Sequence, residues 1–273
     1  MVRSLWSAAT GMIAQQTNVD TISNNLANVN TAGYKTEIAE FKSLLYQNLQ
    51  TRTTTANGER KPISAQVGLG VRNSSITSIF RQGNFYESTS TSAFAIDGEG
   101  FFAVRSYTGE IQYTRNGNFN WSVGNSGNLE LTTSDGQQVL DINGRPIAIP
   151  ANFKTSEVTI TADGQVCYPD ENNNPQPLGM TIGLFQFQNP AGLDKVGSSN
   201  YRVTAASGAA INEATTNIAI RRSGLVQGYI EGSNVQVVDE MVNLIIAQRA
   251  YEMNSKVIQA SDDMMGQANQ LRS

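Results

Sequence analysis

The sequence of 273 residues contains no histidine and only one cysteine, Cys167. Without histidine the chain lacks the commonest general base and metal ligand, and no Ser-His or Cys-His catalytic arrangement can form. One cysteine allows no disulfide within the chain, so we expect Cys167 to fill a small apolar space in a strand. These absences exclude most hydrolase triads and histidine-based metal centres.

Charge is also scarce, since Asp, Glu, Lys and Arg make up 15% of the residues, against about 25% in a typical soluble protein. The net charge is −4 and no run of Lys or Arg provides the basic stripe that nucleic-acid binding requires. No apolar run approaches the about 20 residues of a membrane-spanning helix. We therefore expect neither a nucleic-acid partner nor embedding in a membrane.

Catalytic sequence motifs are missing as well. The phosphate-binding pattern G-x-x-x-x-G-K, the dinucleotide pattern G-x-G-x-x-G and the nucleophile pattern G-x-S-x-G do not occur. Asp97 and Glu99 could pair for glycoside cleavage, but Asp-Gly is ordinary turn composition and we favour a turn. Residues 141–144 resemble the start of a calcium loop, although the later ligands do not follow. We predict no catalytic, metal or cofactor site.

The N-terminal residues show apolar side chains at a seven-residue spacing, which is typical of a helix that pairs with another helix. Gln15 is the one polar residue in this repeat, and Gly33 provides a stop signal. The predicted pairing face consists of Leu5, Ala8, Met12, Val19, Ile22, Leu26 and Val29.

The C-terminal residues repeat this design. Ser233 and Gln236 resemble a capping box, and Asp239 and Glu240 place negative charge near the start of a helix. The two apolar stripes are similar in length, so we predict that the two helices pair. Their remaining apolar flanks need another cover, either further copies of the chain or the chain's own β domain. The predicted C-terminal pairing face consists of Val242, Ile246, Ala250, Met253, Val257, Ala260, Met264 and Leu271.

The middle of the chain alternates short β-prone segments with turn dipeptides such as Asp97-Gly98, Asn116-Gly117 and Asp163-Gly164. This spacing indicates an all-β barrel or sandwich. Residues 47–75 are polar and β-prone, as in a long connection or an extended hairpin. The sequence thus predicts an α+β protein with an N-terminal helix over 1–33, an extended hairpin over 34–75, a β domain over 76–222 and a C-terminal helix over 223–273.

Four segments resemble the flagellar rod and hook protein family. Residues 23–35 (SNNLANVNTAGYK) resemble its N-terminal signature, and residues 248–256 (QRAYEMNSK) resemble its C-terminal one. Residues 95–102 (AIDGEGFF) and 113–119 (YTRNGNF) are similar to its β domain. The chain is identified as a member over nearly its whole length, and only residues 170–177 do not align.

The resemblance implies that both termini form a coiled-coil inner layer around a channel, with the β domain outside it. It implies export through the flagellar secretion apparatus without a cleaved signal, so the N-terminal residues are expected in the mature protein. Residues 46–71 look most like the corresponding stretch of distal rod subunits. The expected function is therefore a non-enzymatic structural subunit of the hollow distal rod in the basal body, which transmits torque from motor to hook.

The implied partners are other copies in a helical filament, proximal rod proteins, hook or hook-junction subunits, and outer-ring bushing proteins. Asn24, Asn25 and Asn28 are candidates either for hydrogen bonds across subunits or for capping the helix end. Within the family, a hook or proximal rod subunit is the main alternative. Outside it, the chain could be a secreted enzyme acting on the cell wall, or an adhesin or scaffold with helical stalks that forms closed oligomers.

Overall fold

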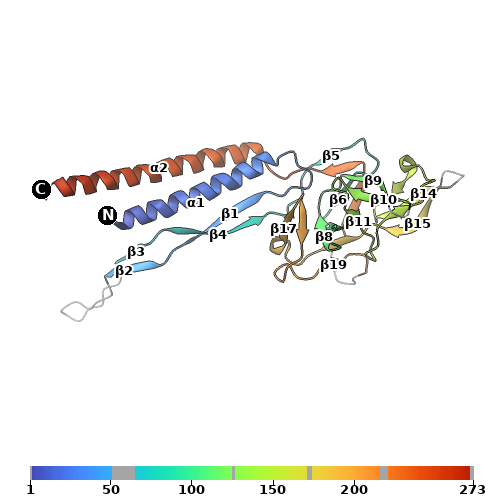
Figure 1. Cartoon of the computed structure of the whole chain (residues 1–273), viewed down its shortest axis with the longest axis horizontal. Helices are drawn as coiled ribbons and strands as arrows, with labels where there is room; N and C mark the ends of the chain where they lie inside the picture. Colours follow the sequence, from blue (N-terminus) through green and yellow to red (C-terminus); the bar gives the residue numbers. More distant parts are fainter. Residues whose placement is uncertain (1, 51–64, 125–126, 171–173, 216–220, 271–273) are drawn as a thin grey trace. The chain divides into compact units, whose positions relative to one another are not determined.

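The computed structural model describes residues 2–50, 65–124, 127–170, 174–215 and 221–270 (Figure 1). The chain divides into two compact units. The first, here called the helical unit, contains residues 1–27, 37–78 and 236–273. The second, here called the β unit, contains residues 28–36 and 79–235. Within the described residues no helix is long and apolar enough to cross a membrane.

The helical unit is built from two long helices and a hairpin. Helices α1 (Val2–Ala27) and α2 (Val237–Gln270) lie side by side and run in opposite directions (Figure 1). Strand β1 (Glu37–Ser43) pairs antiparallel with β4 (Val71–Ser78), and both strands contact α1. Further along the hairpin, β2 (Tyr46–Gln50) pairs antiparallel with β3 (Ala65–Gly68).

The helix ends differ from the predicted bounds. Helix α1 stops at Ala27, and Val29 lies in the following turn, where the Thr31 amide donates to the Asn28 carbonyl at 3.1 Å. Helix α2 begins at Val237, and its Glu240 amide donates to the Gln236 carbonyl at 3.0 Å. The predicted capping box at Ser233 is therefore wrong, because the chain is not yet helical there.

The β unit consists of short strands, all antiparallel in the described residues. Ten of these described strands form one sheet with the order β12-β10-β11-β7-β8-β18-β17, in which β16 pairs with β7 and β19, and β9 pairs with β10. Smaller sheets join β13-β14-β15, β20-β6 and β21-β5. The strands are β5 (Phe85–Glu87), β6 (Phe94–Asp97), β7 (Phe101–Arg105), β8 (Ile111–Thr114), β9 (Phe119–Val123), β10 (Leu129–Thr133), β11 (Gln138–Val139), β12 (Ala148–Ile149), β13 (Thr159–Ile160), β14 (Gln165–Pro169), β15 (Pro175–Thr181), β16 (Leu184–Gln186), β17 (Asp194–Gly197), β18 (Asn200–Arg202), β19 (Ile211–Asn212), β20 (Gly224–Gln227) and β21 (Tyr229–Glu231).

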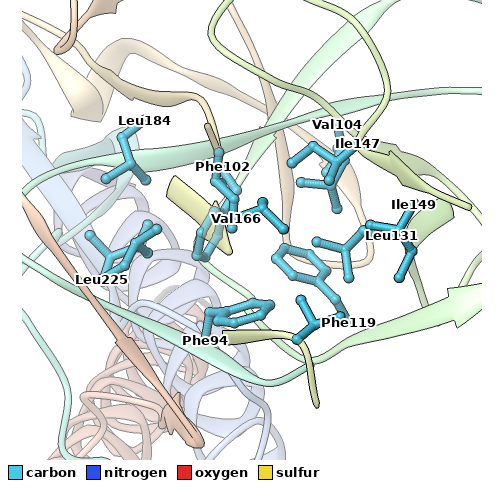
Figure 2. Packing of buried hydrophobic residues seen from close by; sticks show 14 residues of the cluster. Phe94, Phe102, Val104, Phe119, Leu131, Ile147, Ile149, Val166, Leu184 and Leu225 are labelled. Carbon is cyan, nitrogen blue, oxygen red and sulfur yellow. The ribbon is translucent and has the colours of Figure 1, made fainter. Parts of the chain in front are cut away.

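Strand β7 organises the core of the β unit because both of its faces are buried. Phe102 and Val104 point into one cluster, where the Phe102 and Phe119 rings meet edge to face with centroids 5.0 Å apart (Figure 2). Phe101 and Ala103 belong to a second cluster on the opposite face. Successive side chains of a strand point to opposite faces, so a run of four buried residues fills two cores at once. Cys167 is buried in β14, which confirms the apolar role expected of it.

Candidate functional site

The contacts between α1 and α2 involve small and polar residues. The Ser4 and Ser261 hydroxyls lie 3.3 Å apart. One heptad further along α1, Gly11 faces Asn254, and a Cβ atom added to Gly11 would lie 2.9 Å from the Asn254 Nδ2. Two heptads beyond Gly11, Asn25 bonds to the side chain of Glu240. These three pairs mark the antiparallel register of the two helices.

The face of α2 that is shielded lies one residue away from the predicted one. Ala247 and Ser261 are buried, and Asn254 and Ile258 are half-buried. Each of these four residues lies one position after a predicted one; the predicted residues are, in the same order, Ile246, Ala260, Met253 and Val257. One residue is about 100° around a helix. The structure thus places α1 against the neighbouring face of α2, and the predicted pairing of the apolar stripe with α1 within the chain is wrong.

An apolar stripe on α2 consequently stays uncovered in the helical unit. Its side chains repeat at steps of four or seven residues, so they follow one line along the helix. Leu271, which was predicted to continue this line, lies outside the described residues. A role of the stripe in contacts between subunits stays a prediction. The stripe, as named below, consists of Val242 (51% exposed), Ile246 (60%), Met253 (64%), Val257 (45%) and Met264 (50%).

The predicted face of α1 is shielded to different degrees along its length. Ile22 is buried at 5% exposure, whereas Leu5, Met12, Val19 and Leu26 are half-buried. The shielded positions therefore include both the predicted residues and their neighbours, because the helix meets α2 on one side and the β1–β4 hairpin on another. The large side chains of α1 that remain exposed are Trp6 and Ile13.

Of the three candidate asparagines, Asn25 is used within its own chain. Its Nδ2 donates to the Glu37 carbonyl at 2.8 Å, and its Oδ1 accepts from the Glu37 amide at 2.9 Å. Both polar atoms of the Asn25 side chain are therefore engaged within its own chain, and a bond of this residue across subunits stays a prediction. Asn28 accepts from the Thr31 hydroxyl at 3.1 Å, which supports the helix-end alternative for that residue. Asn24 is exposed.

The environment of Glu240 is unusual for a carboxylate. Burial raises the pKa of Glu240, the hydrogen bond from Asn25 opposes this, and the charge of Asp239 raises the pKa further. The first turn of α2 thus packs its acidic group against the end of α1 rather than leaving it in water.

The hairpin also presents apolar side chains to solvent. Leu45, Tyr46 and Leu49 are among the exposed large residues of the chain; Leu45 directly precedes β2, and the other two lie within it. Antiparallel two-stranded ribbons are marginal in water without a cover. Like α2, the hairpin therefore has apolar side chains that the helical unit does not cover.

Sequence reasoning missed a buried ionic group in the β unit. The Glu231 carboxylate lies 2.6 Å from Lys35 Nζ and 3.1 Å from Arg115 Nε. Burial and the nearby Arg115 lower the pKa of Lys35 and Glu231 raises it, with a net value of about 8 against 10.5 ordinarily. Lys35 and Arg115 lie inside two of the segments that resemble the family, and this was the one sequence signal that could have pointed to the ionic group.

The described residues show little that could carry chemistry. They contain no group of three or more His, Cys, Asp or Glu side chains placed to hold a metal ion. A cavity of about 280 Å³ in the β unit is lined in part by Glu213 and Ser223. The Glu213 carboxylate accepts hydrogen bonds from the Ser223 hydroxyl at 2.9 Å and from Gln186 at 2.8 Å. This acid therefore acts as a structural acceptor.

Sequence comparisons place the chain among flagellar axial proteins. Residues 5–35 match the family described as flagella basal body rod protein, and residues 226–271 match the C-terminal part of the flagellar basal body rod FlgEFG proteins. Residues 95–168 match the D1 domain of the flagellar hook proteins FlgE/F/G. The flagellar basal-body rod protein FlgG of Borreliella burgdorferi is 42% identical, covering 100% of this chain and 99% of that protein. The FlgG protein of Caulobacter vibrioides is 41% identical, covering 100% of both chains.

Proposed function

This chain belongs to the family of flagellar basal-body rod proteins, and we propose that it is a structural subunit of the distal rod. In this role, copies of the chain assemble into a hollow helical filament in the cell envelope and transmit torque from the motor to the hook. The observation that carries the proposal is the full-length relationship to FlgG proteins.

The stripe on α2 supports assembly with further copies. Each of its side chains is about half exposed in the chain. Burying the exposed part against another copy is worth about 1 kcal/mol per side chain. Five such residues therefore contribute about 5 kcal/mol to a contact between subunits. A contact of this kind joins two different surfaces, and when the rotation between copies does not close, it generates a helical filament.

The polar contacts between α1 and α2 support an assembly that depends on neighbouring copies. An isolated amphipathic helix is marginal in water, and most of its stability comes from packing of its apolar face. The pairs at Ser4–Ser261 and Gly11–Asn254 are polar or small, and the apolar stripe of α2 remains exposed, so much apolar surface of the helix pair stays uncovered within the chain. We therefore propose that both helices become fully ordered as an inner coiled-coil layer only at a growing end.

The hairpin supports the same arrangement. The apolar side chains of Leu45, Tyr46 and Leu49 would be covered by a neighbouring subunit, as the family resemblance implies for this segment. At its two ends the filament would meet proximal rod proteins and hook or hook-junction subunits. Ring bushing proteins would surround it, and the flagellar export apparatus would deliver its subunits.

A complementation experiment tests the proposed function. The chain would be expressed in a Caulobacter strain that lacks its own FlgG protein, with a small epitope inserted at Gly109. This glycine has φ +84° and nothing within 4 Å of an added Cβ, so the turn has room for an insertion. A loop at residues 51–57 would be another site, but it lies outside the described residues.

Electron microscopy of purified basal bodies would locate the epitope. We expect a label along the distal segment of the rod together with restored motility. A label confined to the hook or to the proximal rod would support the alternative position within the axis, and basal bodies without any label would refute the proposal.

We also propose that the chain has no enzymatic activity. The relatives are named as rod proteins, and the exposed Asp97 and Glu99 lie on either side of Gly98, which has φ +141° in the turn after β6. Purified chain would be incubated with peptidoglycan at several pH values. Release of soluble fragments that disappears in an Asp97→Asn, Glu99→Gln variant would overturn this part of the proposal.

A further inference from the structure

The ionic group at Glu231 lies in the segments by which the chain enters and leaves the β unit. Lys35 belongs to residues 28–36, which follow α1, and Glu231 shortly precedes residue 235, the last residue of the β unit. The side chains of Lys35 and Glu231 are 0% exposed, and that of Arg115 is 3% exposed. Two cations and one carboxylate are therefore enclosed together.

Several polar atoms of this group also bond to backbone. Lys35 Nζ donates to a carbonyl of the segment that follows β4, and the amide of Gly83 in the same segment donates to the Glu231 carboxylate. Enclosed charges need such partners, because desolvation is otherwise too costly. The bonds are Lys35 Nζ to Arg81 O (2.9 Å), Gly83 N to Glu231 Oε1 (2.9 Å), Arg115 Nη1 to Gly98 O (2.8 Å) and to Gly100 O (2.6 Å), and Gly33 N to Glu231 O (2.8 Å).

Asn234 joins the same segments with its side-chain amide. Its Oδ1 accepts from the Thr36 amide at 2.7 Å and from the Thr36 hydroxyl at 2.8 Å. Its Nδ2 donates to the Ile79 and Arg81 carbonyls, both at 3.0 Å. An amide has two acceptor sites and two donor hydrogens, so every one of them is used.

Close backbone packing completes the arrangement. Gly33 has φ +69°, and a Cβ atom added to it would lie 2.6 Å from the Asn116 amide nitrogen. Residue 33 therefore rests directly on the backbone that carries Arg115, which leaves no room for a side chain.

We propose that Lys35, Arg115, Glu231 and Asn234 form a clamp that holds residues 28–36, 79–83 and 231–235 to the β unit in a free subunit whose helices are not yet covered by copies. The clamp sets the boundary between the part of the chain that folds alone and the part that folds on assembly. The chain crosses between the units through these segments, so a load on the helices reaches the clamp first. The inference rests on the proposed function only for the assembly-dependent folding of the helices.

Hydrogen exchange on the free full-length chain tests the clamp. The amides of Gly33, Ile79 and Gly83 each donate a hydrogen bond that joins two of the three segments, to Glu231 O, Thr36 O and the Glu231 carboxylate respectively. In the wild type we expect them to be protected, while amides of α1 and α2 exchange rapidly. The Leu131 amide, which bonds to Ile147 O at 3.0 Å in the core, reports on the rest of the β unit.

Two variants and one matched control complete the design. Glu231→Gln should lower protection of the three segments by about 100-fold or more, because removing one partner of a buried ion pair has an effect of this size. Protection of the Leu131 amide should change by less than about 3-fold. Asn234→Ala should act on the same segments without leaving an unpaired charge. The control, Glu157→Gln, breaks the exposed Lys154–Glu157 pair (3.0 Å) of the same unit and should change none of them.

Three results would overturn the inference. The first is exchange at the three segments as fast as in the helices of the wild type. The second is equal loss of protection at Leu131 in Asn234→Ala, because the group would then stabilise the whole β unit rather than its boundary. The third is unchanged protection in both variants. A failure of this chain to form rods would count against the proposed function alone, since the exchange experiment uses the free subunit.

Discussion

Replacing Val257 by Asp is expected to prevent assembly while the β unit stays folded. Val257 is 45% exposed in the stripe of α2, so covering it in a filament is worth about 1 kcal/mol. An Asp at this place must be desolvated or protonated instead, which costs roughly 3 kcal/mol or more. The total change of about 4 kcal/mol per contact corresponds to about a 1,000-fold rise in the concentration required for assembly.

The measurement compares three purified chains, the wild type, Val257→Asp and Gln259→Asp. Gln259 is exposed on the same helix two residues further on, away from the stripe, so its variant adds an identical charge without touching the apolar line. Light scattering over a range of protein concentrations gives the onset of assembly, and motility of complemented cells gives the result in vivo. The near-ultraviolet circular dichroism of the aromatic core serves as the check that the β unit is folded.

The reasoning would be refuted by assembly of Val257→Asp at the wild-type concentration, or by normal motility of cells that carry it. Equal loss of assembly in Gln259→Asp would show that added charge, and not the apolar stripe, decides the outcome.

Further predictions concern both units. Leu26→Asp on the half-buried face of α1 should likewise abolish motility with the β unit intact, as circular dichroism would show. In hydrogen exchange, Glu231→Gln should lower the free energy of opening at Gly33 and Gly83 by about 3–5 kcal/mol, because two buried cations lose their carboxylate. Lys35→Met should cost less, about 1–3 kcal/mol, since Arg115 and Glu231 then remain as a neutral pair. Because burial lowers the pKa of Lys35 to about 8 in the folded chain, against 10.5 ordinarily, the folded state binds fewer protons between these values. The free energy of opening at these amides in the wild type, relative to Lys35→Met, should therefore rise with pH from about 8 to about 10.5, by at most about 1.4 kcal/mol per pH unit. A fall over this range would contradict the assignment. Gly33→Ala should destabilise the β unit by more than about 1 kcal/mol, because a Cβ meets backbone at a positive φ.

Much of the architecture could be read from local patterns. Heptad spacing predicted helices at both ends, and the Asn-Gly and Asp-Gly dipeptides predicted a strand-rich middle. Strand β7 also shows why the β unit was readable, since the continuous apolar run at residues 101–104 is typical of a strand buried on both faces. These features depend on neighbours along the chain, which the sequence displays directly.

The helix faces show where local patterns stop. The apolar spacing of α2 correctly located a stripe, but the stripe does not face α1. Ala247 and Ser261, each one residue beyond a predicted position, are buried instead. Periodicity reveals which side chains are apolar, whereas the choice of partner depends on which surfaces approach most closely, and small residues such as Gly11 permit that approach.

The sequence by itself therefore determined the helices, the β-rich middle and the family of this protein, because each is encoded in short-range spacing or in contiguous motifs. Only the tertiary structure decided which face of α2 stays uncovered within the chain, that Asn25 bonds within its own chain, and that Glu231 is enclosed with Lys35 and Arg115. Lys35 and Glu231 are 196 positions apart. No local rule can bring such charges together, because their pairing becomes favourable only once folding has removed the water between them.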